Sequence, residues 1–169
     1  MKALVTGHLG FIGRHLTKRL IHEGWEVVGM DALHDIDIRF SEFPKVDVVF
    51  HLAGVAGVRA SIEQPDYYWN NNAGGSARLF KHYAKEGVKV YYASSSSAKR
   101  WWLNPYATTK KAIEELAPPN SCGMRFHTVY GFDSRPDMLY DKLLNKTVMY
   151  ITDHVRDFTH VDDVVEAIM

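Results

Sequence analysis

Thr6-Gly7-His8-Leu9-Gly10-Phe11-Ile12-Gly13 is the stretch that decides the fold, because of what stands on either side of it. Residues 2–6 form a short apolar run, as buried parallel strands do. Apolar residues then recur at helical spacing over 11–22, and 25–30 is a second apolar run. The sequence therefore predicts a β-α-β unit with a right-handed crossover and a glycine-rich turn before its helix.

The rest of the chain continues this alternation of strands and helices. We predict strands at 46–52, 88–93 and 124–130, and helices at 70–86, 106–116 and 162–169. Such alternation is typical of a doubly wound parallel sheet in the α/β class. No internal repeat, low-complexity tract or linker interrupts it, so we expect residues 1–169 to form a single domain.

Composition excludes several classes of protein. With 46% hydrophobic and 24% charged residues, the chain has the balance of an ordinary globular domain. A net charge of zero gives no electrostatic footprint for nucleic acid. Cys122 is the only cysteine, which rules out an intrachain disulfide and fits a reducing compartment. No signal peptide or membrane-spanning run is visible, and no histidine pair shows metal-ligand spacing, so we expect a cytoplasmic protein without a metal site.

The three glycines of the turn fit a dinucleotide-binding site. Gly7 would allow the tight turn, Gly10 the approach of a pyrophosphate, and Gly13 the close packing of helix on strand. The helix N-terminus adds free N–H groups and a partial positive charge. Asp31 ends the second predicted strand, where a carboxylate accepts hydrogen bonds from both ribose hydroxyls and repels a 2′-phosphate. We therefore favour NAD over NADP, although an ordinary turn and a polar strand end remain the alternatives.

Tyr106 and Lys110 stand four residues apart, so on a helix they share one face. A free tyrosine has a pKa of about 10 and is a poor base at neutral pH, but a neighbouring ammonium favours the phenolate. Four serines, at 94–97, follow the predicted strand 88–93, at the sheet edge where open α/β folds bind ligands. The pattern indicates an acid/base site made of a serine, Tyr106 and Lys110. An exposed helix pair beside a polar turn is the alternative.

These motifs together resemble the extended short-chain dehydrogenase/reductases, and within them the NAD-dependent nucleotide-sugar epimerase/dehydratase family. The resemblance is greatest to the UDP-glucuronate 4-epimerases. It extends over most of the chain, in blocks that follow the family order: 56–59, 91–97, 106–112, 123–131, 135–138, and 156–159 with Asp162 and Asp163.

The resemblance implies a role for individual residues. Tyr106 would be the catalytic base and acid, Lys110 would tune it and hold the nicotinamide ribose, and Ser95 would be the catalytic hydroxyl. Besides Tyr106 and Lys110, the NAD-binding residues would be Gly7, Leu9, Gly10, Phe11, Ile12, Gly13, Asp31, Asp37, Ile38, Leu52, Ala53 and Gly54. The residues that contact a UDP-sugar would be Arg59, Ser96, Thr128, Arg135 and Arg156. Ser96 is also the second choice for the catalytic hydroxyl. Arg135 would suit a uronate carboxylate, and Arg156 the diphosphate.

The chain is shorter than the family pattern at several places. The segment 31–46 is too short for the usual helix and full third strand, and 37–39 would be the remnant that reaches the adenine. The loop between Ser97 and Tyr106 is contracted. The chain ends at Met169, without most of the family's substrate-binding C-terminal portion. We therefore expect a minimal Rossmann-type fold.

The reaction that this resemblance predicts is oxidation and reduction at C4 of a UDP-sugar such as UDP-glucuronate. One alternative is a cofactor-binding module that is inactive alone or depends on a partner chain. Another is a reductase or dehydratase acting on a smaller substrate. The family also implies a homodimer, formed through the helices 70–86 and 106–116. Trp101 and Trp102 would stack on the sugar or uracil, fill the gap left by missing segments, or form an oligomer contact.

Overall fold

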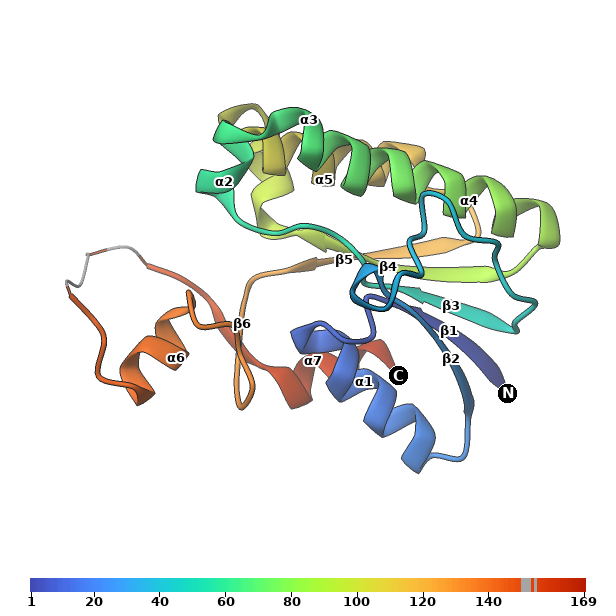
Figure 1. Ribbon diagram of the computed structural model, residues 1–169, viewed down its shortest axis with the longest axis horizontal. Coiled ribbons are helices and arrows are strands. Elements are labelled where there is room, and N and C mark those ends of the chain that lie inside the picture. The colour runs from blue at the N-terminus through green and yellow to red at the C-terminus, as the bar shows by residue number, and fades with distance from the viewer. Residues whose placement is uncertain (150–152, 154) are drawn as a thin grey trace.

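The structure, a computed structural model, describes residues 1–149, 153 and 155–169. Its centre is a five-stranded sheet in the order β2-β1-β3-β4-β5, in which every neighbouring pair is parallel. The strands are β1 Lys2–Thr6, β2 Glu26–Met30, β3 Val48–His51, β4 Lys89–Ser95 and β5 Ser121–Phe126. The chain runs outward from β1 to β2 and then returns to continue on the other side of β1 (Figure 1). This order confirms the predicted doubly wound sheet.

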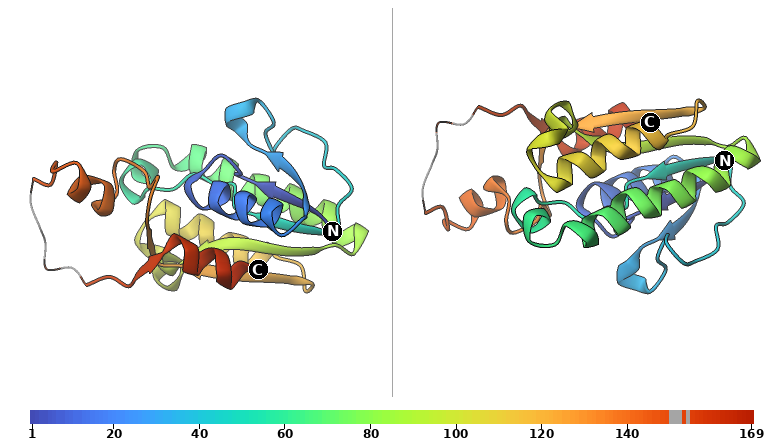
Figure 2. Two further views of the ribbon diagram at one scale, coloured as in Figure 1. Left: turned by 90° about the horizontal axis from the view of Figure 1, so that it is seen from below. Right: turned by 90° about the horizontal axis from the view of Figure 1, so that it is seen from above.

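Helices cover both faces of the sheet, as Figures 1 and 2 show. On one face lie α1 (Phe11–His22) and α7 (Val161–Ile168), which pack against each other. On the other face lie α4 (Gly75–Glu86) and α5 (Pro105–Leu116). Successive residues of β1 belong to two different hydrophobic clusters: Ala3 and Val5 are in one, and Leu4 is in the other. This explains why the strands are apolar throughout instead of alternating.

The predicted helix 70–86 begins earlier than its sequence pattern indicated. A helical path starts with α2 (Val58–Glu63) and α3 (Pro65–Tyr68), passes through a π-helical segment η2 (Trp69–Gly74) and continues as α4. Pro65 is the first residue of α3, a position that tolerates proline because its missing N–H would be unpaired there anyway. The path ends at Gly87, whose left-handed backbone closes α4 as a glycine cap.

The prediction of one strand over 124–130 was wrong, because two strands with different partners share that run. After β5, His127 interrupts the ladder, and β6 (Thr128–Tyr130) pairs in parallel with β7 (Phe158–His160) as a separate small sheet. Between β6 and β7 lies α6 (Leu139–Leu144), which stands beside the main sheet in Figure 1. The predicted loop after the serine run is also helical, as the 3-10 segment η3 (Ser96–Leu103).

The segment that joins β2 to β3 holds one short element, η1 (Ala32–His34), and adds no strand to the sheet. This agrees with the expectation that the segment is too short for the usual helix and full third strand, and it leaves β2 as an edge strand within the described chain. Side chains of α4 hold the segment: Arg78 donates hydrogen bonds to the carbonyl oxygens of Ile38 (2.8 Å) and Ser41 (2.6 Å). Tyr83 does the same to Pro44 (2.8 Å).

Across the part of the chain that the structure describes, no helix has the length and apolar character needed to span a bilayer. No group of three or more histidine, cysteine, aspartate and glutamate side chains within the same residues is arranged to hold a metal ion.

Candidate active site

A cavity of about 400 Å³ lies at the carboxyl ends of β1, β3 and β4. One wall is the glycine turn with the first residues of α1, and another is the segment 52–58 after β3. Ser95, Tyr106 and Lys110 line it from β4 and α5. A second cavity of about 240 Å³ shares part of the glycine turn and of the segment after β3, and extends past the end of β2. The two cavities together form a depression along the edge where this fold class binds its ligands.

The glycine turn is closely packed against its surroundings. Gly7 has a φ of +70°, and a Cβ there would lie 2.8 Å from backbone atoms of Ala53. A Cβ on Gly13 would lie only 2.0 Å from the carbonyl oxygen of Gly7. Gly10 is the N-cap residue of α1, and no side chain caps that helix. Phe11, Gly13 and their neighbour Ile12 line the larger cavity, so the uncapped N-terminus of α1 borders it.

Asp31 lines the smaller cavity, at the end of β2. Its carboxylate accepts hydrogen bonds from the backbone N–H groups of Leu9 and Leu33, both at 3.0 Å. A carboxylate has about four lone-pair sites, so two are left for ribose hydroxyls. Leu9 itself lines neither cavity, and its N–H is already used by this contact.

Asp37 and Ile38 also line the smaller cavity, and Ile38 is buried. The Arg39 guanidinium lies 2.6 Å from the Asp37 carboxylate. Its hydrogen bonds lower the pKa of Asp37 below the ordinary value. The short segment after β2 therefore reaches the cavity with the charged carboxylate of Asp37 and with several apolar side chains, among them Leu33, Ile36 and Ile38.

Tyr106 is placed by the start of α5. Asn104 caps this helix by accepting a hydrogen bond from the Ala107 N–H (2.9 Å), and Pro105 is its first residue. Burial raises the pKa of Tyr106, while a hydrogen bond with Ser95 and the charge of Arg135 partly offset that rise. Ser95 therefore lies beside the phenol, as the resemblance implied. Ser96 lines neither cavity.

Lys110 is buried, and its Nζ donates a hydrogen bond to the carbonyl oxygen of Ala93 (3.0 Å). Burial lowers the pKa of Lys110 to about 8, because the charged form loses its hydration. A Cβ on Gly54 would lie 3.3 Å from this Nζ, so the glycine leaves room for the ammonium at the cavity wall. Tyr106 and Lys110 thus reach one cavity from the same face of α5.

Asn72, which the sequence analysis missed, ties two walls of the cavity together. Its side chain is buried, accepts a hydrogen bond from the Val55 N–H (2.7 Å) and donates to the Val55 carbonyl oxygen (3.0 Å). It also donates to Thr109 Oγ1 on α5 (3.1 Å). Asn72 is the third residue of the predicted helix 70–86, but in the structure it lies inside a longer helical path, where an asparagine is unfavourable unless its side chain has such a task. The helix start predicted at residue 70 concealed this signal.

His51 belongs to the run 51–54 that contributed to the resemblance, but no role was assigned to it from the sequence; it lies at the end of β3 in a buried chain of polar groups. Its Nδ1 is 2.7 Å from Thr6 Oγ1, and its Nε2 is 2.8 Å from Ser76 Oγ. Thr6 Oγ1 in turn accepts a hydrogen bond from the Ala53 N–H. Burial, and next the charge of Lys110, lower the pKa of His51 to about 3, so the imidazole is neutral at physiological pH.

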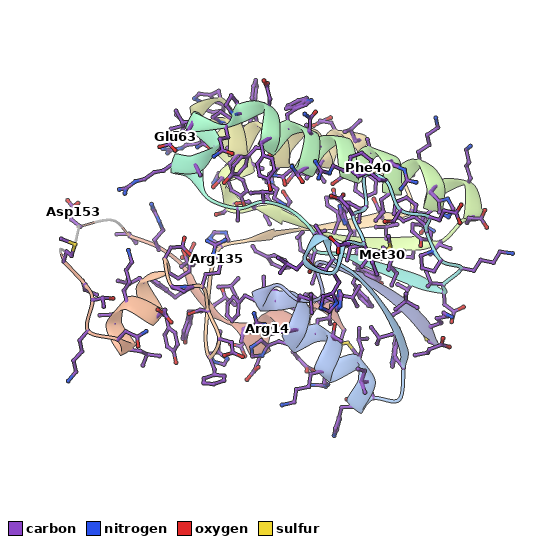
Figure 3. All side chains as sticks on the ribbon, viewed as in Figure 1. Arg14, Met30, Phe40, Glu63, Arg135 and Asp153 are labelled. Carbon is purple, nitrogen blue, oxygen red and sulfur yellow. The ribbon has the colours of Figure 1, made fainter. Side chains whose placement is uncertain are left out.

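Of the residues expected to contact a sugar nucleotide, Arg135 lines the larger cavity. It follows β6 and is labelled in Figure 3. Its guanidinium is paired with the carboxylate of Asp137, Nε to Oδ1 at 3.0 Å. The others line neither of the two cavities: Arg59, Ser96, Thr128 and Arg156. The structure therefore brings together the three predicted catalytic residues and one of the predicted substrate contacts.

Trp101 and Trp102 lie on η3, away from both cavities. Their exposed fractions are 44% and 63%, so they do not fill a gap inside the fold. Trp102 instead borders an open surface depression together with Trp69. Of the three interpretations, stacking on a sugar within the site and plugging a gap are not supported.

Comparison with known proteins places this geometry in a family. Residues 3–99 match the model of the NAD dependent epimerase/dehydratase family. The chain is 34% identical to Protein CapI of Staphylococcus aureus, covering 99% of this chain and 68% of CapI. It is 31% identical to a UDP-glucuronate 4-epimerase of Thermodesulfobacterium geofontis, covering 95% and 68%. A solved structure, MoeE5 in complex with UDP-glucuronic acid and NAD, superposes with a TM-score of 0.86 at 32% identity, covering 99% of this chain and 71% of that one.

The alignment with CapI is 227 positions long, which exceeds the 169 residues of this chain, so CapI carries additional residues inside the matched span. This agrees with the internal shortening seen between β2 and β3. Strand order, glycine turn, matched family model and relatives lead to one conclusion: this chain belongs to the NAD dependent epimerase/dehydratase family.

Proposed function

We propose that this chain binds NAD and inverts the C4 configuration of a UDP-sugar, with UDP-glucuronate as the favoured substrate. The observation that carries the proposal is the meeting of Ser95, Tyr106 and Lys110 in one cavity with the glycine turn. The choice of substrate is supported by similarity to several proteins named UDP-glucuronate 4-epimerase, among them the one from Thermodesulfobacterium geofontis.

The residues present fit NAD. At Gly7 and Gly13 there is no room for side chains, and the turn leaves the N-terminus of α1 bordering the cavity, where N–H groups and the helix dipole suit a pyrophosphate. Asp31 retains lone pairs for ribose hydroxyls. Buried Lys110 reaches the wall beside Gly54, a place suited to the second ribose. We further propose that residues 1–169 form one NAD-binding domain that carries the catalytic residues.

Bound NAD would supply the hydride chemistry, namely the reversible removal of a hydride from C4 of the sugar and its return to the opposite face. Tyr106 as phenolate takes the proton of the C4 hydroxyl and later gives it back. Ser95 Oγ donates a hydrogen bond to the same oxygen. Arg135 turns its guanidinium from Asp137 toward the uronate carboxylate, which offers the same two-pronged geometry.

The Tyr106 phenolate must be stabilised if it is to form at neutral pH, because burial holds the pKa of Tyr106 above its ordinary value of about 10. Bringing it to about 7 requires more than about 4 kcal/mol of preferential stabilisation of the charged form. The Ser95 hydrogen bond and the positive charge of Arg135 act in that direction. The positive nicotinamide ring adds to them when the cofactor is oxidised.

The test is to incubate the purified protein with NAD and UDP-glucuronate and to follow the C4 configuration by proton NMR. Formation of UDP-galacturonate, abolished in Tyr106→Phe but retained in Tyr140→Phe, is the expected result. Calorimetry on both variants should show unchanged NAD affinity. Turnover by Tyr106→Phe at the wild-type rate would refute the mechanism.

A second candidate function is favoured by one observation. Four of the five predicted substrate contacts do not line the cavity. In this alternative the chain binds NAD but turns over a sugar nucleotide only beside a partner chain that completes the site. Intact NAD binding without any conversion, followed by conversion once a candidate partner is added, would support it.

A further inference from the structure

Glu114 lies on the same face of α5 as Tyr106 and Lys110, each four residues from the next. Tyr106 meets Ser95, and Lys110 donates a hydrogen bond to the Ala93 carbonyl oxygen. The third of these side chains, Glu114, accepts a hydrogen bond from the Ser94 hydroxyl. Three consecutive residues at the end of β4 are therefore each bonded to one of three successive turns of the helix.

The Glu114 carboxylate is itself held from the neighbouring strand. Arg125 on β5 donates to it twice, Nε to Oε1 and Nη2 to Oε2, both at 2.7 Å. Arg125 is also the ladder partner of Ser94, and the next ladder pair contains Ser95. Hydrogen bonds from Arg125, and next from Ser94, lower the pKa of Glu114, so the carboxylate is charged at physiological pH. One side chain thus joins α5, β4 and β5 beside the predicted catalytic hydroxyl.

We propose that Glu114, held by Arg125, is a positioning residue that fixes α5 against the end of β4 and thereby keeps the Tyr106 phenol in contact with Ser95. The inference rests on the proposed function for its choice of Ser95 and Tyr106 as the acid/base pair. A two-pronged ion pair defines orientation as well as distance, whereas the single bond of Ser94 alone would let the helix slide or rotate. The Lys110 contact with β4 is likewise a single hydrogen bond, so it does not define the orientation of the helix.

The same helix supplies a matched control. Glu115 is the next residue, and it forms an exposed ion pair with Lys111 along the helix surface. Exposed pairs of this kind contribute little to stability, and this one connects two residues of the same helix, so it holds no strand. Glu115→Gln therefore removes a carboxylate and an ion pair from α5 without touching the contact between Glu114 and β4.

The first measurement needs neither NAD nor substrate. The protein is labelled with ¹³C at Cζ of tyrosine, and the Tyr106 resonance is assigned by its loss in Tyr106→Phe. We expect Glu114→Gln and Arg125→Gln to move this resonance, because the hydrogen bond between Ser95 and the phenol is weakened, while Glu115→Gln leaves it in place. Should Glu114→Gln fail to fold, Ser94→Ala removes only the hydroxyl on β4 and should move the resonance in the same direction. An unmoved resonance in the folded variants overturns the proposal, as does an equal movement in Glu115→Gln.

The second measurement is steady-state kinetics with UDP-glucuronate. Glu114→Gln should lower kcat about tenfold or more and change KM less than about twofold, because the reacting pair is disturbed and the substrate contacts are not. The kcat of the double variant with Glu114→Gln and Arg125→Gln should be no lower than the lower kcat of the two single variants. Wild-type kcat in Glu114→Gln would overturn the inference. If the wild-type protein itself shows no turnover, the proposed function fails, and the ¹³C measurement still decides the role of Glu114.

Discussion

Replacing Lys110 by methionine should stabilise the folded protein at pH 7 while destroying its activity. Methionine has a similar length and no charge. A pKa of about 8, against 10.5 for the free side chain, means that folding disfavours the buried ammonium by about 3 kcal/mol. The variant loses the hydrogen bond to the Ala93 carbonyl oxygen, worth about 1 kcal/mol. The expected net gain in the free energy of unfolding is therefore about 2 kcal/mol.

The sign of the pH dependence follows from the lowered pKa. Between pH 8 and 10.5 the unfolded chain binds more protons at Lys110 than the folded one, so this group makes the wild-type protein more stable as pH rises through that window. The methionine variant lacks this contribution. The destabilisation of the wild-type protein by buried Lys110 should fall from about 3 kcal/mol at pH 7 to about 1 kcal/mol at pH 10. Most of the difference in the free energy of unfolding between the variant and the wild type should therefore disappear.

The assay is urea unfolding of NAD-free protein at pH 7 and pH 10, with Lys111→Met as the control. Lys111 is the next residue of the same helix, and its exposed pairing with Glu115 gives no reason for a gain. Turnover should fall about 100-fold or more in Lys110→Met and stay near wild type in Lys111→Met. A Lys110→Met protein that is less stable than wild type at pH 7, or an advantage that does not shrink by pH 10, would refute the reasoning.

Three further predictions follow from the site. His51 has a folded pKa of about 3, so its contribution to the free energy of unfolding is lost as pH falls from about 6.5 toward 3. In urea unfolding, the free energy of unfolding should therefore decrease less between pH 7 and pH 4.5 in His51→Gln than in the wild-type protein, and an equal decrease would contradict this. Gly13→Ala places a Cβ 2.0 Å from the Gly7 carbonyl oxygen, so NAD affinity measured by calorimetry should fall about tenfold or more, whereas Gly74→Ala, with its nearest neighbour 3.9 Å away, should bind normally. Asp31→Ala should narrow the preference for NAD over NADP about tenfold in the same assay, and an unchanged ratio would mean that this carboxylate does not face the ribose.

Local patterns were enough to predict the first β-α-β unit. β1 and α1 have the bounds expected from the sequence, because an apolar run, a helical period and the glycines between them all agree. The single strand expected over 124–130 was wrong for the opposite reason. The run contains no glycine or proline that would mark a break. What divides it at His127 is the change of partner from β4 to a strand at 158–160, far away in the sequence.

The site shows the same division between local and long-range information. Tyr106 and Lys110 are an i, i+4 pair, so a motif could find them, and the serine run marked the end of β4. Asn72 and Glu114 have no such motif, because their partners lie on other elements. The expected substrate contacts depend on segments whose course no local rule gives, and most of them lie outside the cavity. The homodimer, the cytoplasmic location and the roles of the site residues stay predictions.

The edge strand β2 has a consequence for how the protein behaves in concentrated solution. Within the described chain it pairs with β1 alone, so its outer row of N–H and C=O groups is a template onto which another chain could add a strand. Two features of the strand oppose such growth: it is only five residues long, and it opens with the exposed carboxylate of Glu26, paired with Lys2. The shortened connection after β2 thus leaves β2 without a covering strand. The short length and the charge of this edge strand oppose its pairing with a strand of another molecule.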